Sequence, residues 1–344
     1  MKRFYFFLTL LAIAALACSL PSKPSASTQF LETATQPQSA LSEVEGSQDE
    51  AAVTQSPPTD SAQPPVHSAT NNPPQQNPRG NSATPSMSDV TYCTVDGVAL
   101  KMDLYYPAAS EAPLPVTMYV HGGGWSKGDK AEGAGAQEIP ALQNAGFLVV
   151  SVNYRLAPEY PFPAMIQDIK CAVRYLRAQT SQYNLDPNRI GVWGGSAGGH
   201  LVNLLGTTDE SVGFDVGEYL EYSSRVQAVV SMFGPTDLTV QFEGGYEGAS
   251  RVFDGFDAAL ASPVAYVSED DPPFLMLHGD TDKLVPIEQS QILLAALQSV
   301  GVPAELVTVI NAGHSFKPVD GKTISPSRKE ITQMVVEFFE LKLK

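Results

Sequence analysis

Basic residues are scarce in this sequence, and nowhere do they form a run. The 344 residues include 21 lysines and arginines against 37 aspartates and glutamates, which gives a formal net charge of −16. Proteins that bind nucleic acid neutralise its phosphates with clustered lysine and arginine. The composition therefore argues against a nucleic-acid partner, and we attribute the acidic balance to solubility.

Side chains that commonly bind metals are also few. The five histidines are scattered and no HExxH motif occurs, so the sequence predicts no zinc site. Of three cysteines, one falls in an N-terminal export signal, which leaves Cys93 and Cys171. An oxidising compartment would permit a disulfide between them, but two cysteines are not a disulfide framework. Because Cys171 lies on the apolar side of a helical pattern, we expect two buried free thiols.

The N-terminal apolar run, Phe4–Ala17, is too short to span a bilayer comfortably, since a spanning helix needs about 20 apolar residues. With its basic start, it is typical of a secretory signal rather than of an anchor that stays attached. Residues 15–18, Ala-Leu-Ala-Cys, resemble a bacterial lipobox, in which Cys18 becomes the lipidated first residue. The same residues fit an ordinary cleavage site, which would release a soluble protein. Either way, we expect residues 1–18 to direct export.

Residues 19–88 are rich in Pro, Ser, Gln, Thr, Ala and Asn and contain a single aromatic residue, Phe30. Such a segment cannot bury enough apolar surface to offset its ordering entropy. We therefore expect a disordered tether over 19–88 that joins the export signal, and any lipid anchor at the cell surface, to a folded domain over 89–344.

The domain alternates predicted strands and helices. The stretch from Val90 onward alternates in polarity around a turn at Asp96-Gly97, which predicts an antiparallel hairpin. Short apolar runs predict buried strands, at Leu114–Val120, Gly146–Tyr154, Arg189–Trp193, Val226–Phe233, Phe274–Gly279 and Ala304–Ile310. Amphipathic helical patterns occur at 164–179, 290–300 and 330–342. This alternation predicts an α/β fold, with a mostly parallel sheet covered by helices on both faces.

A glycine-rich segment, GGSAG at 194–198, follows one predicted strand and opens a predicted helix. It fits G-x-S-x-G, the nucleophile elbow, in which a tight strand-to-helix turn exposes a serine hydroxyl. Side chains at Gly194 and Gly198 would clash in such a turn. The alternative is a glycine-rich packing turn, but the flanking strand and helix favour Ser196 as a nucleophile.

A serine nucleophile needs a base, and elimination among five histidines identifies one. His67 lies in the tether, His121 precedes a glycine triplet and His278 ends a strand. His200 lies one turn past the serine on the same helix, so packing is its expected role. His314, in a loop between the last apolar run and the final helix, is the predicted base.

The base in turn needs a carboxylate that holds its tautomer. Asp280 and Asp282 follow the Phe274–Gly279 strand, and Asp237 is a more distant candidate. We choose Asp282 and expect Asp280 to cap or brace the turn. The resulting order of Ser, Asp and His along the chain is the one expected for α/β hydrolases.

Serine attack on a carbonyl creates an oxyanion, which main-chain amides can bind only where no side chain intervenes. The sequence HGGGW at 121–125 supplies such a loop after a strand. The amide of Ala197, at the start of the helix, points into the same space, and His121 is expected to brace the loop.

These pieces, in this order, resemble the α/β-hydrolase superfamily. More narrowly, they resemble the hormone-sensitive-lipase-like esterases and the feruloyl- and acetylesterase-like group, through HGGGW, NYRLAPEYPFPA, WGGSAGGHL and HGDTDKLVP. The resemblance covers about residues 90–342. It implies hydrolysis of carboxylic esters without metal or organic cofactor, with oxyanion donors at Gly123, Gly124 and Ala197.

Lipase-like relatives often carry a large helical cap before the HGGG segment, and this chain has no room for one. We expect residues 211–224 and 241–256 to rim the acyl pocket, and such short loops suit bulky or polymeric esters, including polysaccharide-linked ones. Two alternatives stay open: a peptidase of the prolyl-oligopeptidase type, and an inactive hydrolase fold that acts as a surface binding protein.

Overall fold

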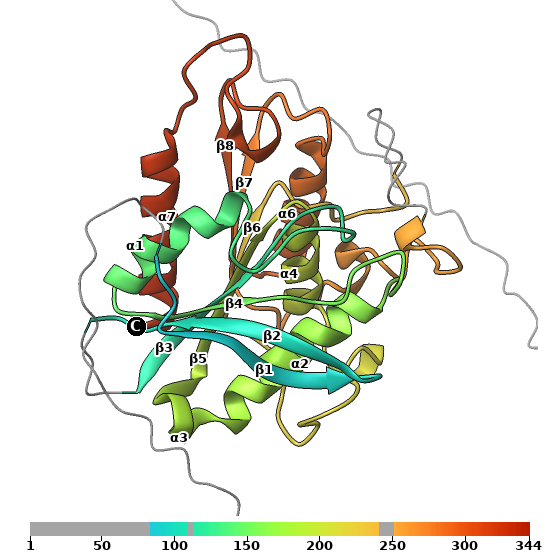
Figure 1. Cartoon of the computed structure of the whole chain (residues 1–344). Helices are drawn as coiled ribbons and strands as arrows, with labels where there is room; N and C mark the ends of the chain where they lie inside the picture. Colours follow the sequence, from blue (N-terminus) through green and yellow to red (C-terminus); the bar gives the residue numbers. More distant parts are fainter. Residues whose placement is uncertain (1–82, 109–112, 241–250) are drawn as a thin grey trace, which may run out of the picture. The chain divides into compact units, whose positions relative to one another are not determined.

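An eight-stranded sheet organises the residues that the computed structural model describes, which are 83–108, 113–240 and 251–344 (Figure 1). The strand order is β1-β2-β4-β3-β5-β6-β7-β8. The pairs β1–β2 and β2–β4 are antiparallel, and all later neighbours are parallel. The strands are β1 (Met87–Val95), β2 (Val98–Tyr105), β3 (Leu114–Val120), β4 (Leu148–Val152), β5 (Leu185–Gly195), β6 (Ala228–Met232), β7 (Phe274–Gly279) and β8 (Ala304–Val309).

The central strands are buried along their whole length. Every residue of β3, β4, β6 and β7 is buried, as expected for strands of a parallel sheet that is covered on both faces. The continuous apolar runs in the sequence reflect this burial, and the run predicted at Leu114–Val120 coincides with β3. The predicted hairpin is also present, with Val95 paired to Val98 across the Asp96-Gly97 turn.

Helices cover both faces of the sheet, in two layers that Figure 1 separates clearly. One apolar core lies under α2, α4 and α6, and a second lies under α1 and α7. The helices are α1 (Ile139–Asn144), α2 (Ala164–Ala178), α3 (Thr180–Tyr183), α4 (Ala197–Thr207), α6 (Glu288–Ser299) and α7 (Arg328–Leu343), with 3-10 turns η1 (Ala134–Glu138), η2 (Glu210–Val212), η3 (Pro263–Tyr266) and η4 (His314–Phe316). The predicted α/β-hydrolase fold is confirmed.

The strand order places a natural crevice between β3 and β5. From β3 the chain goes on to β4 on one side, whereas β5 is followed by β6 on the other side. In open parallel sheets, ligands bind at the carboxyl ends of strands where the order reverses in this way. Val120 pairs with Gly194 at these ends, so the HGGGW and GGSAG segments leave the sheet side by side.

The expectation of two free thiols is wrong. Cys93 of β1 and Cys171 of α2 form a disulfide, with a Cα–Cα distance of 6.5 Å. Both residues are buried where the hairpin packs on α2. The pairing depends on this packing of two segments that are 78 residues apart in the chain, which neither cysteine spacing nor helical pattern encodes.

The predicted export signal, with Cys18, and almost all of the predicted tether lie outside the described residues. The described residues belong to one compact unit, Gln75–Lys344, and β1 begins at Met87, one residue before the predicted end of the tether at residue 88. Within 83–108, 113–240 and 251–344, none of the helices combines the length and apolar character needed to cross a bilayer.

Candidate active site

Ser196 occupies a strained turn between β5 and α4. Its backbone has φ 58° and ψ −122°, a conformation that costs of order 1–3 kcal/mol outside glycine and that clusters at functional sites. A Cβ on Gly194 would lie 2.6 Å from the backbone of Gly198, and one on Gly198 would lie 2.2 Å from the carbonyl oxygen of Val120. The two flanking glycines are therefore required, as the elbow motif predicts.

The structure brings the three predicted side chains into one hydrogen-bonded line. His314 Nε2 lies 3.0 Å from Ser196 Oγ, and His314 Nδ1 lies 2.8 Å from Asp282 Oδ2. A carboxylate only accepts, so Nδ1 carries the proton and the lone pair of Nε2 faces the serine hydroxyl. The line thus has the tautomer in which an imidazole can take a proton from Ser196.

Asp282 is held rigidly in this line. Its side chain is fully buried, and its Oδ1 accepts hydrogen bonds from the amides of Leu284 (2.9 Å) and Val285 (3.0 Å). These two bonds leave Oδ2 to face His314. On the other side of the imidazole, the ring of Phe233 packs edge-on with a centroid distance of 4.9 Å. The imidazole is therefore fixed at one end by a hydrogen bond and along its side by packing.

The other candidate carboxylates bind elsewhere. Asp280, predicted to cap or brace its own turn, instead accepts through Oδ1 from the amide of Ala312 at 3.2 Å and so contacts the segment before His314. Asp237 closes a local turn by accepting from the amide of Thr239 at 2.9 Å. Of the three carboxylates, Asp282 is the one that contacts the imidazole.

The glycine triplet lies against the elbow. A Cβ on Gly122 would lie 2.7 Å from the carbonyl oxygen of Gly195, and one on Gly123 would lie 2.0 Å from that of Lys127. Gly123 and Gly124 have φ values of 115° and 61°, which glycine adopts readily. In the part of the chain that the structure describes, neither amide donates to a main-chain acceptor. Ala197 begins α4, so its amide is one of the N–H groups that a helix leaves unpaired.

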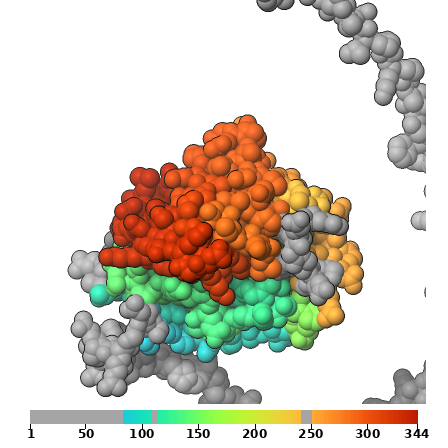
Figure 2. All heavy atoms as spheres, turned by 90° about the horizontal axis from the view of Figure 1, so that it is seen from above, coloured from blue at the N-terminus to red at the C-terminus, as the bar shows by residue number. Residues whose placement is uncertain are grey.

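These segments enclose a cavity of about 760 Å³. Gly123, Gly124, Ser196 and His314 all line it. In the space-filling view, the green segment that follows β3 borders the red segment that follows β8 (Figure 2). Residues far apart in the chain thus meet at one surface, where a substrate can reach Ser196.

The walls of the cavity differ in character. Phe233 and Leu284 form an apolar side, and Leu284 is 41% exposed. Lys127 and Glu132, both exposed, line the side of the glycine loop. Sequence reasoning missed these four wall residues. Only Phe233 had a signal, because it ends an apolar run at the same edge of the sheet as Ser196.

Of the segments expected to rim the pocket, residues 211–224 and the described part of the second, 251–256, do not line this cavity. Residues 211–224 lie over α2 instead, where Asp215 pairs with Lys170 at 2.9 Å and with Arg174 at 2.6 Å. The buried cations of α2 bind this segment, which removes it from the site. Of residues 241–256, the part before 251 lies outside the described residues, and Phe253 packs behind the glycine loop with a centroid distance of 5.1 Å to Trp125.

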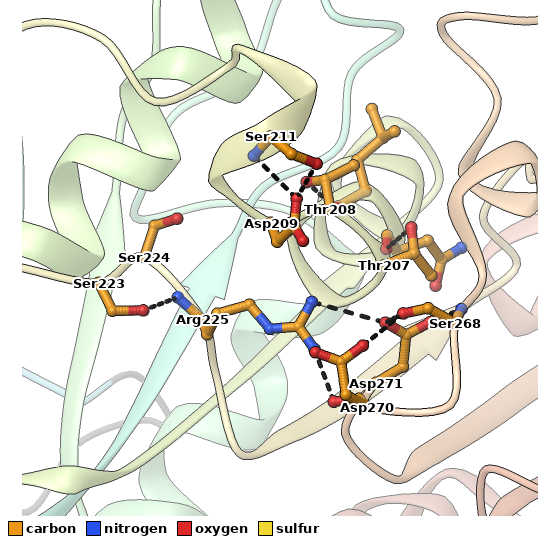
Figure 3. Close-up of polar contacts among 12 residues, drawn as sticks. Thr207, Thr208, Asp209, Ser211, Ser223, Ser224, Arg225, Ser268, Asp270 and Asp271 are labelled. Carbon is orange, nitrogen blue, oxygen red and sulfur yellow. Dashed lines mark hydrogen bonds and ion pairs between the residues drawn. The ribbon is translucent and has the colours of Figure 1, made fainter.

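Residues 209–225 contribute instead to a second cavity of about 350 Å³. Figure 3 shows Arg225 pointing toward Asp270 and Asp209 pointing toward Ser211. Arg225 Nη2 donates to the carbonyl oxygen of Asp270 at 2.6 Å, and Asp209 Oδ1 accepts from the amide of Ser211 at 2.9 Å. These internal bonds engage Arg225 and Asp209, two of the charged groups that line the second cavity.

The remaining described histidines are structural, as predicted for His121 and His200. His121 Nδ1 donates to the carbonyl oxygen of Gly122 at 2.7 Å, and its ring stacks on Tyr154. His278 Nε2 donates to the carbonyl oxygen of Val285 at 2.8 Å. Burial lowers the pKa of all three imidazoles. Among residues 83–108, 113–240 and 251–344, no three His, Cys, Asp or Glu side chains gather as a metal site.

Comparison with known proteins agrees with this geometry. Residues 102–297 match the BD-FAE family. The probable carboxylic ester hydrolase LipM of Mycobacterium tuberculosis is 34% identical over 237 residues, 65% of this chain and 54% of LipM. The chain spans about half the length of the curated relatives that it matches.

Two solved structures share the fold. A truncated carbohydrate esterase from gut microbiota is 28% identical, with a TM-score of 0.64 over 78% of this chain and 99% of that chain. An acetyl ester-xyloside bifunctional hydrolase from Caldicellulosiruptor lactoaceticus is also 28% identical, with a TM-score of 0.60 over 72% and 89% of the two chains. The resemblance read from the sequence is thereby confirmed: this chain belongs to the BD-FAE family and has the α/β-hydrolase fold.

Proposed function

We propose that this protein is a serine carboxylesterase. The observation that carries the proposal is the hydrogen-bonded line from Asp282 through His314 to Ser196, which ends in a cavity beside two glycine amides. Family membership and esterase relatives support the same reaction.

In the proposed mechanism, Ser196 Oγ attacks the ester carbonyl carbon while His314 Nε2 takes the hydroxyl proton. Asp282 stabilises the imidazolium through its bond to Nδ1. The tetrahedral intermediate collapses when His314 returns the proton to the leaving alkoxide, which releases the alcohol and leaves an acyl-serine. Water, deprotonated by His314, attacks the acyl-serine, and a second collapse releases the carboxylic acid and restores Ser196.

The oxyanion of each intermediate would lie against the amides of Gly123, Gly124 and Ala197. Gly123 and Gly124 line the cavity, and Ala197 begins α4 next to the nucleophile. Loss of one such donor typically costs about 2.7–4 kcal/mol of transition-state stabilisation.

The proposed substrate is a short acyl ester of a hydroxyl-rich alcohol, small or attached to a polysaccharide. Two neighbours are named as a carbohydrate esterase and an acetyl ester-xyloside hydrolase. Lys127 and Glu132 on one wall offer charged groups that can form hydrogen bonds with the hydroxyls of the alcohol. The apolar wall of Phe233 and Leu284 suits the acyl group.

We propose that the protein is exported, either lipid-anchored through Cys18 or secreted, with residues 19–88 as tether. The disulfide between Cys93 and Cys171 supports this location, because disulfides persist in oxidising compartments and are rare in the cytosol.

Hydrolysis of a short p-nitrophenyl ester, measured beside a peptide amide, tests the proposal. We expect ester cleavage that Ser196→Ala abolishes and that Ser299→Ala, at an exposed helix end, leaves intact. Preferential cleavage of the amide would favour a peptidase of the prolyl-oligopeptidase type. Inertness of the intact protein toward both would favour a non-catalytic surface binding protein.

A further inference from the structure

A buried histidine links the nucleophile turn to the glycine loop. The amide of His200 donates to the carbonyl oxygen of Ser196 at 3.0 Å, in the first turn of α4. Its Nδ1 lies 3.1 Å from Nε1 of Trp125, the residue that ends the HGGGW run. Both side chains are completely buried. One residue therefore contacts the serine through its backbone and the glycine loop through its ring.

The partners of His200 determine its tautomer. An indole N–H only donates, so Nδ1 of His200 must accept from Trp125. Its Nε2 lies 2.7 Å from the carbonyl oxygen of Ala261, which only accepts, so Nε2 carries the proton. A protonated imidazole would have no acceptor for Trp125. Burial lowers the pKa of His200 to about 4, which keeps the ring neutral at higher pH.

The glycine loop depends on such an external contact. Gly123, Gly124 and Trp125 have consecutive positive φ values of 115°, 61° and 56°. A bulky residue rarely adopts this conformation and holds it only where its surroundings fix it. Residues 122–124 are glycines without side chains. Within residues 122–125, the indole of Trp125 is therefore the side chain that can anchor the loop.

We propose that the His200–Trp125 hydrogen bond is a positioning contact, which fixes the amides of Gly123 and Gly124 relative to Ser196. The proposal rests on the proposed esterase function, in which these amides bind the oxyanion. His200 does not touch the substrate and acts through Trp125. Removal of the bond leaves the nucleophile and its base in place and lets the oxyanion donors shift.

Two amide substitutions separate the two bonds of His200. His200→Asn places an amide oxygen near the position of Nδ1 and keeps an acceptor for Trp125. His200→Gln places an amide nitrogen near the position of Nε2 and keeps the donor to Ala261. We expect His200→Gln to lower kcat roughly 10²-fold with KM nearly unchanged, because the displaced amides bind the oxyanion of the transition state and not the ground-state substrate. We expect His200→Asn to retain kcat within about threefold, since it removes only the bond from Nε2 to the carbonyl oxygen of Ala261, which does not contact the glycine loop.

Trp125→Phe removes the indole N–H and serves as a partner variant. If both residues act through one bond, the double variant with His200→Gln loses no more kcat than the worse single variant. Equal kcat for His200→Asn and His200→Gln, in a protein that is otherwise an active esterase, would overturn the positioning role of the His200–Trp125 bond and leave the esterase proposal intact. An inert wild-type protein would overturn the esterase proposal, and this inference with it.

An NMR measurement on the unmodified protein provides a readout independent of activity and of variant folding. The chain has two tryptophans, Trp125 and Trp193, so its indole signals are readily assigned. We expect slow solvent exchange for the Trp125 indole proton at pH 7 and its acceleration as the pH falls through about 4, the pKa of His200. Exchange at the rate of a free indole at pH 7 would overturn the proposal.

Discussion

Asp282 Oδ2 lies 2.8 Å from His314 Nδ1, while its other oxygen is held by two main-chain amides. The carboxylate cannot turn away from the imidazole without losing these amides, so it presents one oxygen in a fixed direction. The function proposed for Ser196 depends on this relationship, because it determines which nitrogen of His314 remains free to accept a proton.

Asp282→Asn should lower kcat by roughly 10⁴-fold, because an amide nitrogen facing Nδ1 selects the wrong tautomer of His314. The fold should survive, since asparagine is nearly isosteric with aspartate. Steady-state hydrolysis of a p-nitrophenyl ester measures the loss. Asp237→Asn, which retains an acceptor for the local turn at Thr239, is the matched control. A similar loss in both variants would speak against a specific role for Asp282.

Gly123→Ala should reduce kcat by at least about 10²-fold, through displacement of an oxyanion donor. Its Cβ would lie 2.0 Å from the carbonyl oxygen of Lys127, so the loop must move. Gly301→Ala is the control, because Gly301 also has a positive φ, 85°, but no heavy atom lies near its Cβ position. We expect Gly301→Ala to cost about 1 kcal/mol of stability and no activity. Full activity of Gly123→Ala would contradict the role of the loop.

Reduction of the Cys93–Cys171 disulfide should destabilise the domain by about 2–4 kcal/mol, mainly because the bond restricts the unfolded chain. Thermal unfolding with and without a reductant measures this loss as a lower Tm. The double variant Cys93→Ser, Cys171→Ser should have the low Tm under both conditions. A reductant that left the Tm of the wild-type protein unchanged would show that the disulfide does not stabilise it.

Stability should fall between pH 6.5 and about pH 4 because of His200. Its pKa is lowered from 6.5 to about 4 in the folded state, so the unfolded chain takes up a proton in this range before the folded one does. The contribution is present above pH 6.5 and is lost as the pH falls. At about 1.4 kcal/mol for each pKa unit, the loss approaches about 3 kcal/mol.

Denaturant unfolding at several pH values measures this dependence. His200→Asn should flatten the profile, because it removes the group that titrates. His121 and His278 also have lowered pKa values and should leave a residual slope. A profile for His200→Asn as steep as that of the wild-type protein would show that His200 does not cause the acid sensitivity.

Features that depend on a local pattern could be predicted from the sequence. Strand β3 is recognisable because both faces are covered and its apolar run is continuous. Ser196 could be predicted from the two flanking glycines that the turn requires. His314 could be predicted by elimination, because the chain has five histidines. The position after β7 is shared by Asp280 and Asp282, so it narrows the choice to these two carboxylates without distinguishing them.

Features that depend on contacts between distant segments could not be predicted. Cys93 and Cys171 pair because the hairpin packs on α2. Residues 211–224 leave the site because Lys170 and Arg174 of α2 bind Asp215. The hydrogen bond from Trp125 to His200 joins two motifs that are 75 residues apart, and nothing in either motif predicts contact with the other.

Covalent labelling of the nucleophile tests the central claim most directly. A fluorophosphonate reacts with an activated serine, and peptide mapping by mass spectrometry locates the resulting adduct. We predict one equivalent of label on Ser196 in the wild-type protein and none in Ser196→Ala. Label on a different serine, or ester hydrolysis that persists in Ser196→Ala, would contradict the account.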